Sequence, residues 1–444
     1  MILPITKHTN HIWRKKFKSV AKIDQTITKL VHDMYETLEF TGGVGLAAPQ
    51  VASDLLIFII NWGSLKETFI NPRIIKRSKE TSEIEEGCLS VPGFRGLVKR
   101  SNEVAVDYLD IKGVRKRAVL TNFYAKIAQH EIDHLSSVFY SDRIIDQTKL
   151  YQFKPVRIVF FGTDRFGAII LKSLIGQSTV GDYTIPLVIS TADKPSGRDK
   201  KLTPSPVKLL ANDFKLAVET PNKLSSNPEI IKSISTLSPD IIVVSSYGKI
   251  LPKEILEIPK KGSLNVHPSL LPKYKGASPI QTAIANNEKY TGVTIILMDE
   301  GVDTGNILTK KRLKIESSNT YQSLELQLAK LGAEILNQTI HLWVTGKIRP
   351  KKQLSKNSTT TKLLKKDDGL INWQKPPKNL EALIRAYHPW PGVWTYYRST
   401  ESRNQKAEKK ILKLLPNRMV QLEGKNPIKL KQFKQGYKDF KLDW

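Results

Sequence analysis

The sequence predicts a multidomain protein in which an α+β domain is followed by an α/β domain with a doubly wound parallel sheet and a small β-barrel. The chain has 444 residues, which is too long for one ordinary hydrophobic core, so two or three domains are expected. From residue 156 onward, short apolar runs alternate with helical segments, as in βαβ units. Beyond residue 367, short strand-like segments alternate with turns, which suits a small barrel.

The first predicted domain comprises residues 1–150. Strand-like runs at 55–62 and 103–108 are mixed there with helical segments. The join at 146–155 is short and polar and has no long Gly/Ser tract, so we expect two closely tethered domains.

The second predicted domain comprises residues 155–346. An apolar run at 156–162 ends in glycine and precedes a helical stretch at 166–174. An amphipathic helix is predicted over 321–344. Further β-rich runs lie at 186–190, 241–246, 264–266 and 293–298. In such sheets, binding sites form at the carboxyl ends of strands.

The third predicted domain comprises residues 367–444, and the polar segment 347–366 before it is predicted to be a linker. Residues 401–444 contain ten lysines and two arginines against five acidic residues. No internal repeat is visible in the sequence.

The formal net charge of +28 favours a polyanionic partner, although a generally lysine-rich proteome would also explain it. No apolar run reaches the roughly 18 residues of a membrane span, and the first residues lack the apolar core of a signal peptide. The single cysteine fits a reducing cytoplasm. We therefore expect a cytoplasmic protein without a membrane partner.

The most informative motif is Gln-His-Glu-Ile-Asp-His-Leu at residues 129–135. On a helix, His130 and His134 project from one face, where they can share one metal ion. Glu131 would then lie beside the metal and could take a proton from bound water. The next histidine is His267, far outside this segment, so Cys88 is the candidate third ligand. The alternative to a metal site is that residues 129–135 form an ordinary polar helix and that Cys88 is a small buried apolar residue.

Three motifs in one order resemble those of the peptide deformylases: residues 43–50, 86–90 and 129–135. The resemblance covers about residues 1–147. It implies a metal-dependent amide hydrolase that removes the formyl group from nascent N-formylated polypeptides. The bound ion would be Fe²⁺, Zn²⁺ or Ni²⁺, because such ligands accept all three.

The same resemblance implies a role for each matched residue. It makes Cys88, His130 and His134 the metal ligands and Glu131 the general base. Gln50 and the backbone N–H of Leu89 would stabilise the oxyanion. Gly45 would let the substrate backbone lie close by as an added strand.

A second constellation of polar residues lies in the α/β domain. Asn265 and His267 are two residues apart, so their side chains point to the same side of an extended segment. Asp303 lies downstream in Asp-Glu-Gly-Val-Asp-Thr-Gly at residues 299–305. An amide, an imidazole and a carboxylate suit acyl transfer to an amine. A lone histidine after a strand is also commonly a structural group.

Residues 263–280 and 292–305 resemble the 10-formyltetrahydrofolate-dependent formyltransferases. This resemblance implies a Rossmann-like fold and the catalytic residues Asn265, His267 and Asp303. It also implies a folate-contacting loop made of Ser269, Leu270, Leu271 and Pro272.

Residues 194–208 resemble the basic loop that methionyl-tRNA formyltransferases insert at the tRNA acceptor end. The loop carries Arg198, Lys200, Lys201 and Lys208, which can grip phosphates, although a solvated charged loop is the alternative. Segments at 368–373, 384–392 and 421–425 resemble the C-terminal OB-like, tRNA-binding domain of that family.

The chain departs from these patterns at a few positions. Asp164 stands where a proline usually follows the threonine, Ala52 where a glycine is common, and Lys273 and Lys275 where arginines are common. The deformylase-like part ends soon after its metal helix, so a ribosome-docking extension seen in relatives is missing or replaced.

Together the motifs predict a bifunctional enzyme. One half would transfer formyl from 10-formyltetrahydrofolate to initiator Met-tRNA, and the other would deformylate nascent polypeptides, with the ribosome as a further candidate partner. The alternatives are an inactive half, a sugar-nucleotide amine as the acceptor, or an RNA-binding protein without catalytic activity.

Overall fold

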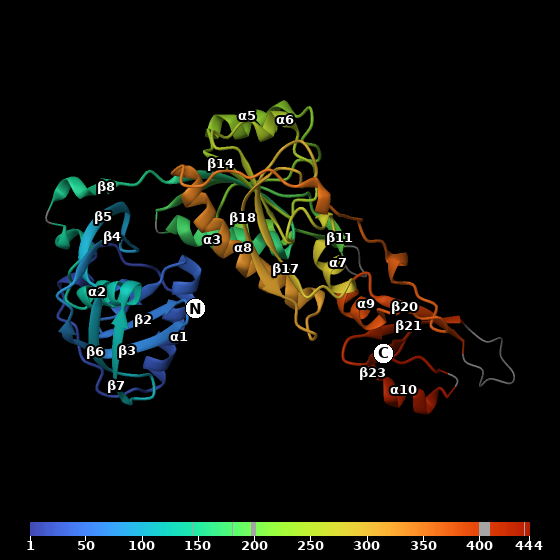
Figure 1. The fold of residues 1–444 in the computed structure, drawn as a ribbon, viewed down its shortest axis with the longest axis horizontal. Helices are drawn as coiled ribbons and strands as arrows, with labels where there is room; N and C mark the ends of the chain where they lie inside the picture. Colours follow the sequence, from blue (N-terminus) through green and yellow to red (C-terminus); the bar gives the residue numbers. More distant parts are fainter. Residues whose placement is uncertain (145, 180, 197–200, 399–408, 439) are drawn as a thin grey trace. The chain divides into compact units, whose positions relative to one another are not determined.

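The computed structural model describes the chain except for residues 145, 180, 197–200, 399–408 and 439. The chain divides into two compact units, residues 1–157 with 172–185, and residues 158–171 with 186–444 (Figure 1). No helix in the described part is long and apolar enough to cross a membrane.

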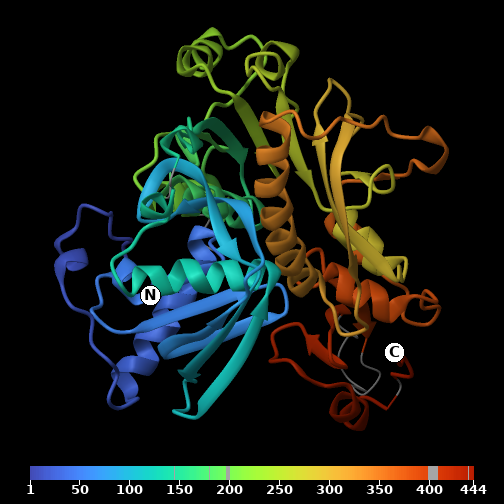
Figure 2. The same ribbon diagram turned by 60° about the vertical axis from the view of Figure 1, so that its left-hand side comes forward.

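The first unit is built on a five-stranded antiparallel sheet of order β1-β2-β3-β6-β7. Its strands are β1 (Gly45–Ala47), β2 (Ile57–Trp62), β3 (Leu65–Arg77), β6 (Glu103–Leu109) and β7 (Arg115–Thr121). Helix α2 (Asn122–His134) lies across this sheet (Figure 2). The predicted strands at 55–62 and 103–108 are therefore confirmed.

Helix α1 (Gln25–Thr41) packs on the same unit. It begins where the Asp24 carboxylate accepts a hydrogen bond from the backbone N–H of Ile27, and it ends at Gly42 with φ +67°. Its buried side chains include Val31, Met34 and Leu38, three or four residues apart.

A second sheet of the same unit has the order β4-β5-β8, with β4 (Thr81–Cys88), β5 (Val91–Ser101) and β8 (Leu150–Gln152). The β4–β5 register shifts between Gly87 and Cys88. Such a bulge redirects a side chain, and here it falls at the predicted thiol ligand. The short 3₁₀ helices of this unit are η1 (His11–Arg14), η2 (Ala48–Val51), η3 (Tyr140–Arg143) and η4 (Gln147–Lys149).

The α/β domain has a seven-stranded sheet of order β13-β10-β9-β14-β15-β17-β18. The strands are β9 (Val156–Gly162), β10 (Tyr183–Ile189), β13 (Val218–Glu219), β14 (Ile241–Ser245), β15 (Ser263–His267), β17 (Tyr290–Leu297) and β18 (Asn306–Lys314). β17 and β18 pair antiparallel, so the sheet is mixed rather than wholly parallel as expected.

The helices of this domain are α3 (Arg165–Thr179), α4 (Pro206–Asp213), α5 (Pro228–Leu237), α6 (Lys253–Leu256), α7 (Pro279–Ala285) and α8 (Tyr321–Val344). α8 matches the predicted helix at 321–344 and begins at a Thr320 cap. Its buried residues Leu324, Leu328 and Leu336 lie on the side that packs against β17.

Residues 347–366 pack against the α/β domain instead of forming a free linker. β19 (Thr360–Thr361) pairs in parallel with β16 (Lys275–Gly276), and Lys351 bridges to Ile307. The segment also contains η5 (Ser355–Asn357) and leads into η6 (Lys366–Gly369).

In the residues that the structure describes, the C-terminal part contains a four-stranded antiparallel sheet with two short helices. Its elements are α9 (Leu380–Tyr387), β20 (Val393–Arg398), β21 (Lys409–Leu415), β22 (Met419–Leu422), β23 (Ile428–Lys429) and α10 (Leu430–Gly436). Leu412, Leu414, Val420 and Phe433 are buried in its core. The structure thus supports a small, mostly antiparallel domain.

Candidate active sites

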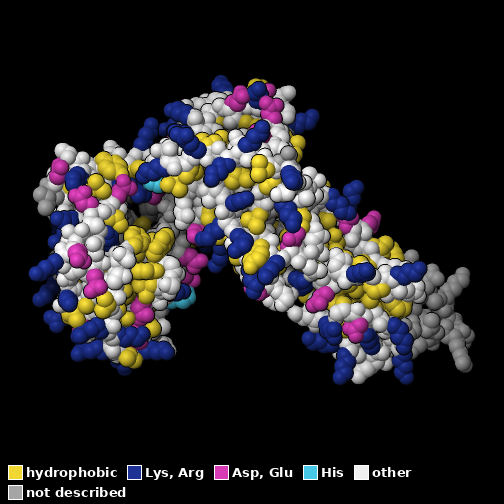
Figure 3. Space-filling model, viewed as in Figure 1, with side chains coloured by type: hydrophobic (Ala, Val, Ile, Leu, Met, Phe, Trp, Pro, Cys, Tyr) yellow, Lys and Arg dark blue, Asp and Glu magenta, His cyan; other side chains and the backbone are white. Residues whose placement is uncertain are grey.

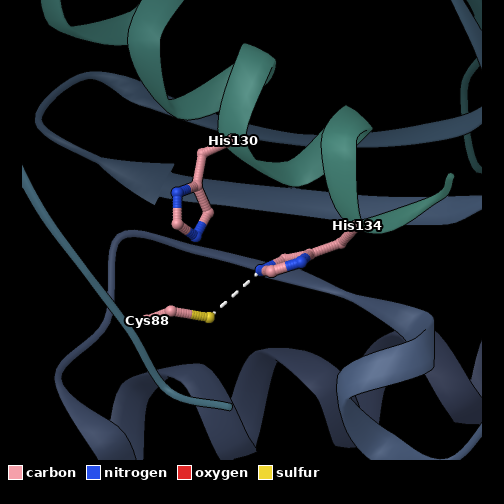
Figure 4. A group of neighbouring side chains, drawn as sticks. All are labelled: Cys88, His130 and His134. Carbon is pink, nitrogen blue, oxygen red and sulfur yellow. Dashed lines mark hydrogen bonds between the residues drawn. The ribbon is translucent and has the colours of Figure 1, made fainter. Parts of the chain in front are cut away.

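Cys88, His130 and His134 come together in the first unit, with their ligand atoms all within 4.8 Å of one another (Figure 4). The two imidazoles project from one face of α2, and Cys88 faces them from the end of β4. The Sγ of Cys88 lies 3.2 Å from Nε2 of His134. One thiolate and two imidazoles at this spacing fit a single ion bound at roughly 2.0–2.3 Å from each ligand.

A buried charge network fixes this ligand set. Glu86 lies 2.8 Å from Nδ1 of His130 and accepts two hydrogen bonds from Arg100, at 2.8 and 2.9 Å. Arg100 also donates to Asp133 at 2.5 Å. Although burial opposes ionisation, Arg100 and His130 lower the pKa of Glu86 to about 2. The carboxylate is therefore charged at neutral pH and orients the His130 ring.

Glu131 lies on the same helix with its carboxylate buried, and its Oε2 has no hydrogen-bond partner among the described residues. Burial raises the pKa of Glu131 to about 7. A Cβ on Gly45 would come within 2.6 Å of Oε1 of Glu131, so only glycine fits this position without a shift. The carboxylate thus has free hydrogen-bonding capacity beside the ligand set, as a general base requires.

Gln50 and Leu89 flank Cys88. The Oε1 of Gln50 accepts from the backbone N–H of Ala47 at 2.8 Å, which leaves its NH₂ group 3.7 Å from the Cys88 sulfur. A cavity of about 300 Å³ opens here. Its apolar wall includes Val44, Leu89, Phe123 and Ile127.

Asn265, His267 and Asp303 also come together, at the carboxyl end of β15. Asp303 accepts from the Asn265 amide at 3.1 Å and lies 3.4 Å from Nδ1 of His267. The other ring nitrogen of His267 lies 2.9 Å from the carbonyl oxygen of Tyr274. Both ring nitrogens face oxygen acceptors, so an imidazolium would donate to both.

The loop that carries Asp303 is held by a residue that sequence reasoning missed. Asp303 has φ +54°, and the Gln353 amide donates to the carbonyls of Asp303 and Gly305, at 2.9 and 2.7 Å. Gln353 lies in the segment predicted to be a linker. A contact across 50 residues leaves no local pattern that could have revealed it.

A cavity of about 450 Å³ adjoins this second site. Residues 246–251 and 298–303 form much of its wall, together with Asn265 and His267. Of the predicted folate loop, Ser269 and Leu271 are fully buried, and the Ser269 hydroxyl donates to the Lys273 carbonyl at 2.7 Å. Ser269, Leu270, Leu271 and Pro272 do not line this cavity.

The predicted tRNA loop is a hairpin of β11 (Lys194–Ser196) and β12 (Lys201–Thr203). Arg198 and Lys200 lie outside the described residues. Lys201 is exposed, whereas Lys208 forms an ion pair with Asp193 at 2.8 Å. Lys and Arg side chains are otherwise scattered over the face shown in Figure 3 rather than gathered in one patch.

Comparisons with known proteins assign both halves of the chain to enzyme families. Residues 2–150 match the family model "Polypeptide deformylase", residues 156–340 match "Formyl transferase", and residues 363–418 match "Formyl transferase, C-terminal domain". The methionyl-tRNA formyltransferase of Caldanaerobacter subterraneus is 43% identical over 253 residues, which are 57% of this chain and 81% of that protein. The methionyl-tRNA formyltransferase of Caldicellulosiruptor saccharolyticus is 38% identical over 311 residues, which are 64% of this chain and 98% of that protein.

Among solved structures, a peptide deformylase from Acinetobacter baumannii with bound Met-Ala-Ser is 32% identical, covers 32% of this chain and 99% of that chain, and has a TM-score of 0.32. A peptide deformylase from Legionella pneumophila is also 32% identical. It covers 34% of this chain and 89% of that chain, with a TM-score of 0.32.

The matches and the two sites define a protein with two formyl-handling enzyme domains, a hydrolase and a transferase. The chain belongs to the methionyl-tRNA formyltransferase family and has a peptide deformylase domain fused before its formyltransferase domains.

Proposed function

We propose that this chain catalyses both formylation of methionyl-tRNA and deformylation of peptides. The observation that carries the proposal is that each family domain contains a complete set of reactive groups: Cys88, His130, His134 and Glu131 in one, and Asn265, His267 and Asp303 in the other.

For deformylation, Cys88, His130 and His134 would hold Fe²⁺, Zn²⁺ or Ni²⁺, which would supply Lewis-acid activation of water. Glu131 takes the proton of the attacking water and passes it to the leaving amine. The amide of Gln50 and the backbone N–H of Leu89 donate to the oxyanion. The orientation of the Gln50 amide supports this role: its carbonyl is engaged by the backbone N–H of Ala47, so its NH₂ group points toward Cys88.

The nascent formyl-methionyl peptide would bind in the adjoining cavity. The apolar side chains of Val44, Leu89 and Ile127 suit a methionine side chain. The absence of a side chain at Gly45 lets the peptide backbone lie against β1 as an added strand.

For transfer, the neutral amine of the methionyl ester attacks the formyl carbon of 10-formyltetrahydrofolate, and the carbon–N10 bond breaks. Asn265 holds the formyl oxygen. His267 donates to the developing oxyanion through Nε2, which must first release the Tyr274 carbonyl. Asp303 orients both residues and helps to move the amine proton toward N10.

The donor would occupy the cavity of about 450 Å³, against residues 246–251 and 298–303. The predicted folate loop would then support the donor site from below without touching the donor. This loop is made of Ser269, Leu270, Leu271 and Pro272. This refines the sequence-based assignment of that loop to folate contact.

The acceptor tRNA would contact the basic hairpin through Arg198, Lys200 and Lys201, and the C-terminal domain, which we propose to be OB-like. Lys208 would reach RNA only by exchanging its Asp193 partner. We propose that both reactions take place in the cytoplasm, with deformylation near the ribosome.

The test is formyl transfer from 10-formyltetrahydrofolate to Met-charged initiator tRNA, with His267→Ala as the control. We expect product with the wild type and at least about a hundredfold less with the variant, while tRNA binding persists. Formylation of a sugar-nucleotide amine instead, or of neither acceptor, would refute the methionyl-tRNA assignment. Hydrolysis of a formyl-methionyl peptide tests the other half independently.

A further inference from the structure

Leu363 is a large apolar side chain on the wall of the transferase cavity, and the mechanism above does not use it. It belongs to the segment 347–366, which packs against the α/β domain through β19. Its side chain is 72% exposed although it lines the cavity, whereas the next residue, Leu364, is buried. An apolar group of a ligand that enters the cavity would cover this leucine and remove apolar surface from water.

Hydrogen bonds of the two preceding residues hold Leu363 at the cavity. The Thr361 hydroxyl donates to the Lys275 carbonyl at 2.9 Å and accepts from the backbone N–H of Ser278 at 3.0 Å. The Ser278 hydroxyl in turn donates to the carbonyl of Lys362 at 2.6 Å. The backbone that presents the leucine is therefore fixed to the α/β domain directly before it.

This part of the wall is close to the triad. Gly276, the strand partner of Thr361, donates its backbone N–H to Oδ2 of Asp303 at 2.8 Å. The same carboxylate oxygen lies 3.4 Å from Nδ1 of His267. Two residues of chain span at most about 7 Å, so the Cα of Leu363 lies no further than that from the Cα of Thr361. Leu363 and the triad therefore belong to one continuous stretch of the wall.

The cavity wall has two parts, and the two substrates must share them. The proposed donor position is against residues 246–251 and 298–303. A second part of the wall is formed by Gly276, Ala277, Pro279 and Leu363. Asp303 lies at the junction, because it ends the first part and its carboxylate is hydrogen-bonded to Gly276. Since the amine must meet the formyl carbon at the triad, the acceptor can lie against the second part while the donor fills the first.

We propose that Leu363 contacts the methionine side chain of the acceptor and thereby helps to select methionyl-tRNA over other aminoacyl-tRNAs. The inference rests on the proposed transfer reaction. The methionine side chain and the reacting amine are bonded to the same carbon atom, so the side chain lies beside the triad when the amine is in place. The thioether chain is apolar, whereas the ester, the ribose and the phosphates of the acceptor end are polar. Leu363, Ala277 and Pro279 supply the matching apolar surface.

The test compares formylation of one initiator tRNA charged either with methionine or with alanine, whose side chain is too short to reach the leucine. In the wild type we expect kcat/KM to be at least about tenfold higher for the methionyl ester. In Leu363→Ser this preference should fall to about twofold or less, through the methionyl ester alone, and Leu363→Met should retain it. Because the side chain is exposed, the melting temperature should change little. The KM for 10-formyltetrahydrofolate should stay the same.

Leu354→Ser is the matched control, because Leu354 lies in the same segment, is 75% exposed and does not line the cavity. It should keep the full preference. The same loss of preference in Leu354→Ser would overturn the inference, since the segment rather than the contact would then be responsible.

A full preference retained in Leu363→Ser would also overturn the inference, as would an equal loss toward both esters or equal use of both esters by the wild type. A raised KM for the donor with an unchanged preference would assign Leu363 to the donor instead. Failure of the wild type to formylate Met-tRNA at all would refute the proposed function, and this inference with it.

Discussion

The two candidate active sites both combine histidine with carboxylate, but different interactions hold these side chains in place. In the deformylase domain, the ligand set is braced by a buried charge network of Glu86, Arg100 and Asp133. In the transferase domain, Asp303 is held by the Asn265 amide and, through its loop carbonyl, by Gln353. In this chain, therefore, charged side chains brace the first site from behind, whereas amide groups brace the carboxylate of the second.

The largest expected effect is that of Cys88→Ala. Removing the thiolate leaves two imidazoles, so the variant should lose stoichiometric metal and its deformylation should fall by more than about a thousandfold. Formyl transfer should be unchanged. Metal analysis with both activity assays checks this prediction, and full metal content in the variant would remove Cys88 from the ligand set.

Glu131→Gln should separate metal binding from catalysis. The isosteric amide cannot take a proton, so we expect deformylation to fall by about a hundredfold to ten-thousandfold. Metal content should stay near that of the wild type. If formyl-peptide hydrolysis were undiminished, another group would have to be the base.

Glu86→Gln tests the charge network behind the ligands. Losing the charge that faces His130 and Arg100 should weaken metal affinity by about tenfold to a hundredfold. Chelator competition measures this affinity. An exposed pair elsewhere in the same domain, broken by Arg117→Gln, is the control and should leave metal affinity unaltered.

Gln353→Ala should have the smallest effect and would sharpen the contrast between the sites. It removes two neutral hydrogen bonds from the Asp303 loop, so we expect formyl transfer to fall by roughly threefold to tenfold. Deformylation should not change. Steady-state kinetics of both reactions measure the effect, and a loss as large as that of His267→Ala would mean that the loop collapses.

Much of both sites was predictable because their residues lie in short motifs. The spacing of His130 and His134 on a helix, and of Asn265 and His267 on a strand, fixes their side-chain directions locally. The antiparallel pairing of β17 with both β15 and β18 was not predictable, because strand direction depends on pairing between distant segments. The contact of Gln353 with the Asp303 loop was missed for the same reason.

Residues 347–366 also bear on how the enzyme is made. The ribosome synthesises the Asp303 loop some fifty residues before Gln353, and Lys275 and Gly276 about eighty-five residues before their partners Thr360 and Thr361. During translation the triad is therefore present before the strand and the amide that brace it. The contacts that hold the Asp303 loop and β16 can therefore form only after residues 353–361, beyond the predicted end of the transferase domain, have been synthesised.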